Sequence, residues 1–211
     1  MTDAPRSVIG VALNFRETMD RLAPSLHVSP YQRPPQGPIL YLKTPNTWIQ
    51  NGQPIPCPAG VDRLRMAGTL GVVIASTACN INAERAFDYV ASFCVANDVS
   101  IPHDSFYRPK LRERCSDGFC SIGAPVDRTA QTTFEIKVFV NGELHSLAST
   151  ASFIRDIAHL IQDTSEFMTL HAGDILLVGE PDNSPLAAPG DAVRVEIAGV
   201  GSIENKVVLE V

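Results

Sequence analysis

Proline and glycine interrupt this chain so often that a long helix has little room in it. The sequence holds sixteen prolines and fourteen glycines among 211 residues, spread along its whole length. Proline removes a backbone donor and glycine favours turns, so both divide a chain into short segments. This pattern predicts a β-rich fold with long loops. The loosest part, residues 24–38, is read as a mobile loop without a helix or a central strand, because it holds five prolines.

Several segments between these breaks predict strands, and two predict helices. In residues 134–140 apolar and charged side chains alternate, and the run ends in Asn141-Gly142, the preferred pair for a tight hairpin turn. Helical spacing of apolar residues predicts helices over 83–94 and 154–161, both packed against the sheet. The other predicted strands are 39–43, 70–75, 174–178, 193–197 and 206–211. We expect one mixed, mainly β domain over residues 1–211.

Composition and charge exclude several classes of protein. Hydrophobic residues make up 45% of the chain and charged residues 19%, a globular balance, and the net charge of −6 gives little attraction for nucleic acid or an anionic membrane. The apolar stretch 70–75 is too short to cross a bilayer, and residues 1–7 contain no apolar signal core. Five cysteines without close pairing predict free thiols in a reducing compartment. We therefore expect a cytoplasmic protein without nucleic-acid or membrane partners.

Four cations gather in one short segment, at Arg108, Lys110, Arg112 and Arg114. If the segment is extended, spacing of two places all four on one side, where guanidinium and ammonium groups suit a ligand that bears carboxylates. The alternative is a solvated basic loop, since charge runs are usually surface.

Single polar residues are less informative. Lys43 follows an apolar strand and points either into a cleft or into water, and Asp98 fits a turn or cap as well as a catalytic role. The five histidines show no metal-binding spacing and are assigned to the surface or to ordinary packing, and Cys115 and Cys120 are assigned structural roles. Residues 179–181 and 199–201 match phosphate loops only weakly.

Several phrases of the sequence resemble the fumarylacetoacetate hydrolase family over nearly the whole chain. They are residues 11–15, 42–47, 95–100, 140–143 and 169–174. Residues 105–109, 115–120 and 165–170 are similar to one branch of the family, which isomerises and decarboxylates unsaturated oxo-acids in homoprotocatechuate breakdown. The chain resembles the N-terminal half of these two-part enzymes. The resemblance implies a β-roll with a few short helices, polycarboxylate substrates, and a homodimer or a heteromer with a paralogous subunit.

The resemblance also implies site residues, and here the chain departs from the pattern. Metal-bearing members carry a Glu-x-Glu pair and a third carboxylate, but Ala67 and Thr69 stand at the pair and only Asp98 remains. Mg²⁺ takes about six oxygen ligands, so no metal is expected in this chain. A family arginine has Pro102 near its place, and the family lysine before the Asp-Gly-Phe segment corresponds to Arg114.

These matches and departures lead to three hypotheses. The preferred one is a subunit of a decarboxylase and isomerase whose Mg²⁺ site lies in a metal-bearing paralog. In it Lys43, Asp98 and Arg114 have catalytic roles, and Arg108 binds substrate carboxylates. The alternatives are a noncatalytic scaffold for that paralog and a module that binds dicarboxylates.

Overall fold

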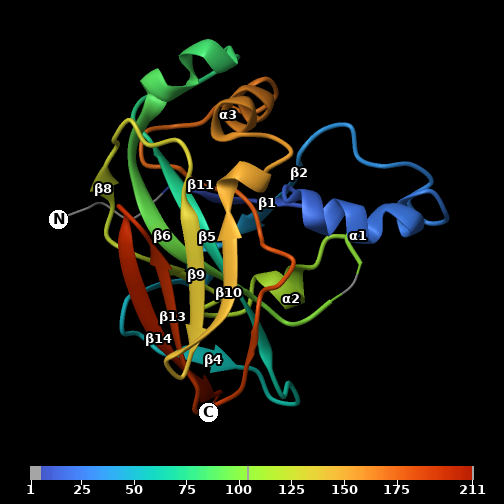
Figure 1. Ribbon diagram of the computed structural model, residues 1–211, viewed down its shortest axis with the longest axis vertical. Coiled ribbons are helices and arrows are strands. Elements are labelled where there is room, and N and C mark those ends of the chain that lie inside the picture. Colours follow the sequence, from blue (N-terminus) through green and yellow to red (C-terminus); the bar gives the residue numbers. More distant parts are fainter. Residues whose placement is uncertain (1–5, 104, 211) are drawn as a thin grey trace.

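Two β-sheets packed face to face form the body of the molecule, and helices lie at its margins (Figure 1). The computed structural model describes residues 6–103 and 105–210. Helix α1 and the irregular segment after it extend to one side of the sheets, and α3 covers one end. The mainly β fold with a few short helices that the sequence predicts is confirmed.

The elements have the following bounds. The larger sheet has the order β2 (Ile39–Lys43), β1 (Val8–Ala12), β11 (Ile175–Leu177), β5 (Leu64–Ile74), β6 (Val90–Ser100), β7 (Cys120–Ile122) and β3 (Trp48–Gln50). Strand β12 (Leu186–Ala187) pairs with β5, and β8 (Val126–Asp127) pairs with β6. The smaller sheet has the order β10 (Glu143–Ser149), β9 (Glu135–Val140), β13 (Ala192–Ile197), β14 (Gly201–Leu209) and β4 (Ile55–Cys57). The α-helices are α1 (Arg16–Leu26), α2 (Leu111–Arg114) and α3 (Ile157–Ser165), and 3₁₀ helices cover Pro45–Thr47, Ala83–Tyr89 and Thr150–Ser152.

The core lies between the two sheets, where strands β5 and β6 are buried along almost their whole length. A glycine in β5 permits the close approach, because a Cβ on Gly68 would lie 2.7 Å from a methyl group of Val138 and 2.9 Å from one of Val195. This packing makes β6 a rigid base for the polar residues near its end.

The larger sheet curls, because its two ends are joined by a short connection. Strands β2 and β3 lie at opposite ends of the sheet order, yet only the turn Pro45–Thr47 and Thr44 separate them in sequence. The indole Nε1 of Trp48 donates to the carbonyl of Lys43 (2.9 Å), so the first residue of β3 is bound to the last residue of β2. The sheet thus closes on itself, with a side-chain hydrogen bond between its two ends.

Most predicted strands are present. Strand β2 has the predicted bounds, and β9, β11 and β13 differ from prediction by about one residue at an end. Asn141 and Gly142 both have positive φ (52° and 85°) and link β9 to β10, as the hairpin prediction required. Strand β5 begins earlier than predicted, at Leu64, and β14 begins at Gly201; residue 211 lies outside the described residues.

The predicted helix over 83–94 is wrong. The segment forms a 3₁₀ helix over Ala83–Tyr89 and then enters β6 at Val90. Both faces of β6 are buried, so its apolar residues do not alternate with polar ones, and the run imitates helical spacing.

Two other boundaries also need correction. The second predicted helix exists as α3 but begins at Ile157, because Asp156 caps it by accepting a hydrogen bond from His159 N (2.9 Å). Residues 24–38 are irregular only after Leu26, because Pro24 lies in the last turn of α1. At this position the missing proline N–H removes only one hydrogen bond of the helix. Ser25 Oγ donates to the carbonyl of Leu22 (2.8 Å).

The described residues contain no helix that is both long and apolar enough to cross a membrane. The five cysteines are free thiols.

Candidate functional site

The site is built around two side chains of strand β2, Tyr41 and Lys43. Residues two apart in a strand lie on the same face, so both side chains point to the same side of β2. Gly10, the partner of Tyr41 in β1, makes room for the aromatic ring, since a Cβ at this position would lie 2.2 Å from it. Glycine in β1 is therefore what allows Tyr41 to lie flat across its neighbour.

Lys43 is the most completely bound residue of the site. Its side chain is buried, with the residue 1% exposed, and its Nζ donates to the carbonyl oxygens of Val99 (2.7 Å), Arg114 (2.9 Å) and Phe119 (3.0 Å). Asp98 Oδ1 lies 2.6 Å from the same nitrogen. An ammonium has three hydrogens, and all three are used by carbonyls, so the attraction to Asp98 is mainly charge on charge.

A chain of polar contacts continues from Asp98 through Tyr41 to Glu180 and Arg114. Tyr41 Oη donates to Asp98 Oδ2 and lies 2.8 Å from Glu180 Oε1. Arg114 Nη1 donates to the same Glu180 oxygen (2.5 Å), lies 3.9 Å from Asp98 Oδ2, and the guanidinium stacks 4.0 Å from the centre of the Tyr41 ring. We call Tyr41, Lys43, Asp98, Arg114 and Glu180 the buried ionic cluster.

The protonation states of the cluster follow from burial and from its charges. Burial raises the pKa of Tyr41 well above its usual value, and the carboxylates of Asp98 and Glu180 raise it further, so the residue stays a phenol. Burial alone would raise the pKa of Glu180 and lower that of Arg114, but their mutual attraction wins and shifts both in favour of the ion pair. The positive charges of Lys43 and Arg114 are therefore balanced by the negative charges of Asp98 and Glu180.

A cleft of about 330 Å³ lies next to the cluster and is lined by residues of β2, α2 and the segment before α2. Two members of the buried ionic cluster, Tyr41 and Arg114, reach its wall. Leucines and aromatic rings supply an apolar lining, and Arg108, Lys110 and His103 add polar groups. The cleft is suited to a ligand with an unsaturated carbon chain and carboxylate ends.

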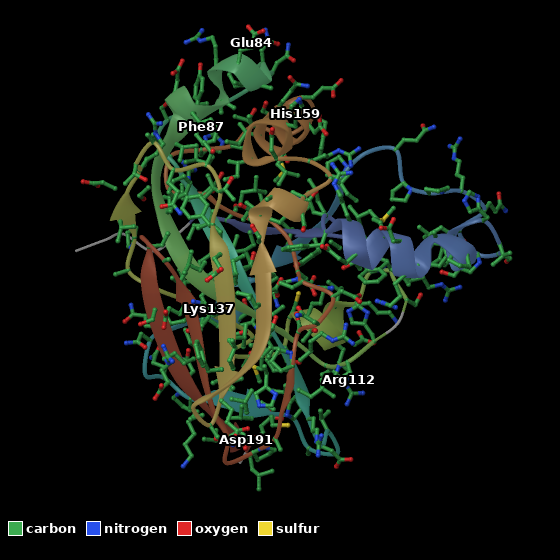
Figure 2. All side chains as sticks on the ribbon, viewed as in Figure 1. Glu84, Phe87, Arg112, Lys137, His159 and Asp191 are labelled. Atoms are coloured by element: carbon green, nitrogen blue, oxygen red, sulfur yellow. The ribbon has the colours of Figure 1, made fainter. Side chains whose placement is uncertain are left out.

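The structure brings Lys43, Asp98 and Arg114 together, although they are far apart in sequence. Arg108 lines the cleft but is not part of the cluster, and its role in substrate binding stays a prediction. The expected extended arrangement of the four cations is wrong, because residues 111–114 form the helical turn α2. Arg114 is therefore 5% exposed, whereas Arg112 points to solvent (Figure 2).

Sequence reasoning missed three residues of the site. Tyr41 could have been found from strand alternation with Lys43. Glu180 follows the buried strand β11 and the residue pair Val178-Gly179, and only the fold brings it to Arg114. His103 was assigned to the surface or to ordinary packing, yet it lines the cleft.

The carboxylate of Asp98 has no second carboxylate beside it on strand β5. Ala67 is its partner in the β5–β6 ladder, and Thr69 is paired with Ala96. Within residues 6–103 and 105–210, no group of three or more His, Cys, Asp or Glu side chains is arranged to hold a metal ion.

Comparison with known families identifies the family to which the chain belongs. The family described as fumarylacetoacetate (FAA) hydrolase C-terminal matches residues 7–208. The chain belongs to this family. The resemblance noted in the sequence is thereby confirmed.

Two curated relatives of Escherichia coli share the branch that the sequence resembles. The chain is 38% identical over 204 residues to the 4-hydroxyphenylacetate degradation bifunctional isomerase/decarboxylase, covering 97% of this chain and 47% of that protein. It is 37% identical over 204 residues to the homoprotocatechuate catabolism bifunctional isomerase/decarboxylase, covering 97% of this chain and 48% of that protein. The chain spans about half the length of these relatives.

Solved structures of the family have the same fold. The 5-carboxymethyl-2-hydroxymuconate delta-isomerase of Mycobacterium smegmatis matches with a TM-score of 0.81 and 27% identity, covering 98% of this chain and 80% of that one. The 2-hydroxyhepta-2,4-diene-1,7-dioate isomerase of Mycobacterium marinum matches with a TM-score of 0.79 and 25% identity, covering 98% and 75%. The family β-roll that the resemblance implied is confirmed.

Proposed function

We propose that this chain is one subunit of a cytoplasmic isomerase and decarboxylase that acts on unsaturated oxo-acids with several carboxylates. The relatives above that carry both activities are about twice as long as the matched segment, which fits a paralogous chain in the role of the other half. The protein would therefore work as a heteromer with such a paralog, or as a homodimer.

One observation carries the proposal: the mostly apolar cleft is lined by Arg108, Lys110 and Arg114. Carboxylate ends of a substrate would bind these cations, since a guanidinium fork matches two carboxylate oxygens. The buried ionic cluster would hold Arg114 and Tyr41 in place from behind, so that the cleft wall is preorganised. In this assignment Lys43 and Asp98 are positioning residues, because neither lines the cleft.

We also propose that this chain binds no Mg²⁺ and that the metal belongs to the paralog. The residues here do not fit such an ion, because Asp98 is already engaged by the Lys43 ammonium and by the Tyr41 hydroxyl. Ala67 and Thr69 add no carboxylate to it, and a hard cation needs several oxygen ligands. No step of the chemistry assigned to this chain passes through a metal.

The experiment is an assay of 2-hydroxyhepta-2,4-diene-1,7-dioate turnover by the purified chain, alone and mixed with a metal-bearing paralog, before and after chelator treatment. We expect activity only from the mixture, and we expect chelation to abolish it. Full activity of the isolated chain after chelation would refute the division of labour between the two chains.

A variant of Arg108 separates the enzyme subunit from a scaffold and from a binding module. In the mixed complex, Arg108→Ala should weaken the apparent affinity for the dioate about 10- to 100-fold, because a charge-assisted hydrogen bond is lost. Arg85→Ala, an exposed arginine outside the cleft, serves as the control and should have no effect. A scaffold predicts no change in either variant, and a binding module predicts dicarboxylate binding by thermal shift without turnover.

A further inference from the structure

The cleft contains few groups that can exchange a proton at neutral pH. Arg108, Arg114 and Lys110 are cations without a free lone pair, and Tyr41 is a phenol whose pKa is raised by burial. The carboxylates of the buried ionic cluster, Asp98 and Glu180, are engaged by cations and by the Tyr41 hydroxyl. Among the described residues that line the cleft, His103 is the one whose imidazole offers a basic nitrogen in the neutral form.

No described residue fixes the imidazole of His103 by a hydrogen bond to its Nδ1. Its Nδ1 is buried and has no hydrogen-bond partner among the described residues, and its ring packs edge-on against Phe106, with centroids 5.4 Å apart. A buried ring nitrogen without a partner is costly in a folded protein, and a ligand that bonds to it would remove that cost.

The charges around His103 favour its neutral form. Burial lowers the pKa of the imidazole, and the cations Arg114, Arg65 and Lys110 lower it further, whereas the carboxylate of Glu180 alone opposes them. These groups come from α2, β5, the segment before α2 and the segment after β11, so they surround the ring from several elements. The imidazole is therefore a proton acceptor, not a cation, near pH 7.

We propose that His103 accepts and returns the proton in the isomerisation step, an inference that rests on the proposed function. The imidazole takes the proton of the substrate's enol hydroxyl. The O–H bond breaks, its electron pair forms the carbonyl double bond, and the two C=C bonds of the diene are replaced by one C=C bond between their former positions. The imidazolium then gives a proton to the far carbon of the former diene, where a C–H bond forms. Oxygen loses one proton and carbon gains one, so nothing is oxidised or reduced.

The test compares His103→Gln with wild type in the active complex, using 2-hydroxyhepta-2,4-diene-1,7-dioate. In wild type, kcat/KM should fall on the acidic side with an apparent pKa below 6.5, the ordinary value for histidine, as the imidazole becomes protonated. In His103→Gln that acidic limb should be absent and kcat should fall about 10²- to 10⁴-fold, with little change in KM. Added imidazole should restore part of the activity of His103→Ala.

The matched control is His159→Gln, because His159 is exposed on α3, at the end of the molecule away from α2 (Figure 2). It should keep the wild-type rate and pH profile. Equal rates and an unchanged acidic limb in His103→Gln would overturn the inference.

A second measurement does not need turnover. In NMR titration of the full chain, the His103 ring should be neutral at pH 7 and should shift when the dioate is added. A His103 ring that is cationic at pH 7 would overturn the inference even if the complex is inactive. An inactive wild-type complex with a neutral His103 ring that responds to the dioate would overturn the proposed function and, with it, the acceptor role, and would leave His103 as a residue that responds to the bound dioate.

Discussion

At the scale of single residues, Glu180 decides whether the buried ionic cluster is neutral. It faces Arg114 at 2.5 Å and the Tyr41 hydroxyl at 2.8 Å, and its side chain is 12% exposed. Removing one member of a buried ion pair is costly, because the other charge stays desolvated without a partner. An exposed pair gains little, because water solvates each partner nearly as well.

Glu180→Gln should therefore lower the free energy of unfolding by about 3 kcal/mol, as measured by urea denaturation. Asp88→Asn, which breaks the exposed pair with Arg85 at 3.3 Å, is the control and should change it by less than about 1 kcal/mol. Equal effects of the two substitutions would mean that the cluster adds nothing to stability.

The same carboxylate makes stability depend on pH. The pKa of Glu180 is lower in the folded protein than the usual value of 4.5, so the unfolded chain binds the proton first as pH falls. The stabilisation is fully present above pH 4.5 and is lost as pH falls through the folded pKa. The curve of unfolding free energy against pH should be flatter below pH 4.5 in Glu180→Gln than in wild type, and parallel curves would contradict this.

Thiol reactivity should follow burial. Cys79 is exposed, whereas Cys94 is buried and burial raises the pKa of its thiol to about 12. Because the thiolate is the reactive form, iodoacetamide at pH 8 should label Cys79 in the native protein and leave Cys94 unmodified. Mass spectrometry of tryptic peptides checks this, with the urea-unfolded protein as the control in which both react. Rapid labelling of native Cys94 would contradict the burial described above.

At the scale of secondary-structure elements, local sequence was informative where only one face of an element is buried. The alternation before Asn141-Gly142 gave β9 and its hairpin, and apolar spacing gave α3. The same reasoning failed for β6, whose two buried faces erase the alternation. For the site, family resemblance supplied Lys43, Asp98 and Arg114, but Glu180 depends on a contact between residues far apart in sequence, which no local pattern encodes.

The pairing of β1 with β2 depends on the glycine opposite Tyr41. In Gly10→Ala the new methyl group would lie 2.2 Å from the ring, so the ring or the strand must move. We expect a loss of about 1–3 kcal/mol in the free energy of unfolding and weaker dioate binding in the complex. Gly37→Ala is the matched control, because a Cβ there meets nothing within 4 Å. Wild-type stability in Gly10→Ala would show that Tyr41 is free to move.

At the scale of the whole molecule, the curled sheet is held closed by Lys43. Its ammonium connects the end of β2 to carbonyls of residues 99, 114 and 119, which belong to or flank β6, α2 and β7. One side chain thus joins the parts of the sheet that have no direct strand pairing with β2.

Lys43→Met keeps the length of the side chain and removes the charge, so three carbonyls and Asp98 lose their common partner. We expect the free energy of unfolding to fall by more than about 3 kcal/mol, with the earliest loss of hydrogen-exchange protection in β3 and β7. Lys206→Met, at an exposed position of β14, should stay within about 0.5 kcal/mol of wild type. A Lys43→Met protein as stable as this control would mean that the sheet closes without the ammonium.

The position of Glu180 in the chain orders events during synthesis. Arg114 leaves the ribosome well before its main counter-charge, and domains grow from the N-terminus. Until β11 and Glu180 have been made, the Arg114 guanidinium lacks its main counter-charge and is better solvated by water. Helix α2 therefore stays in water with it. The wall of the cleft is therefore completed late, once residue 180 of the 211 has been made.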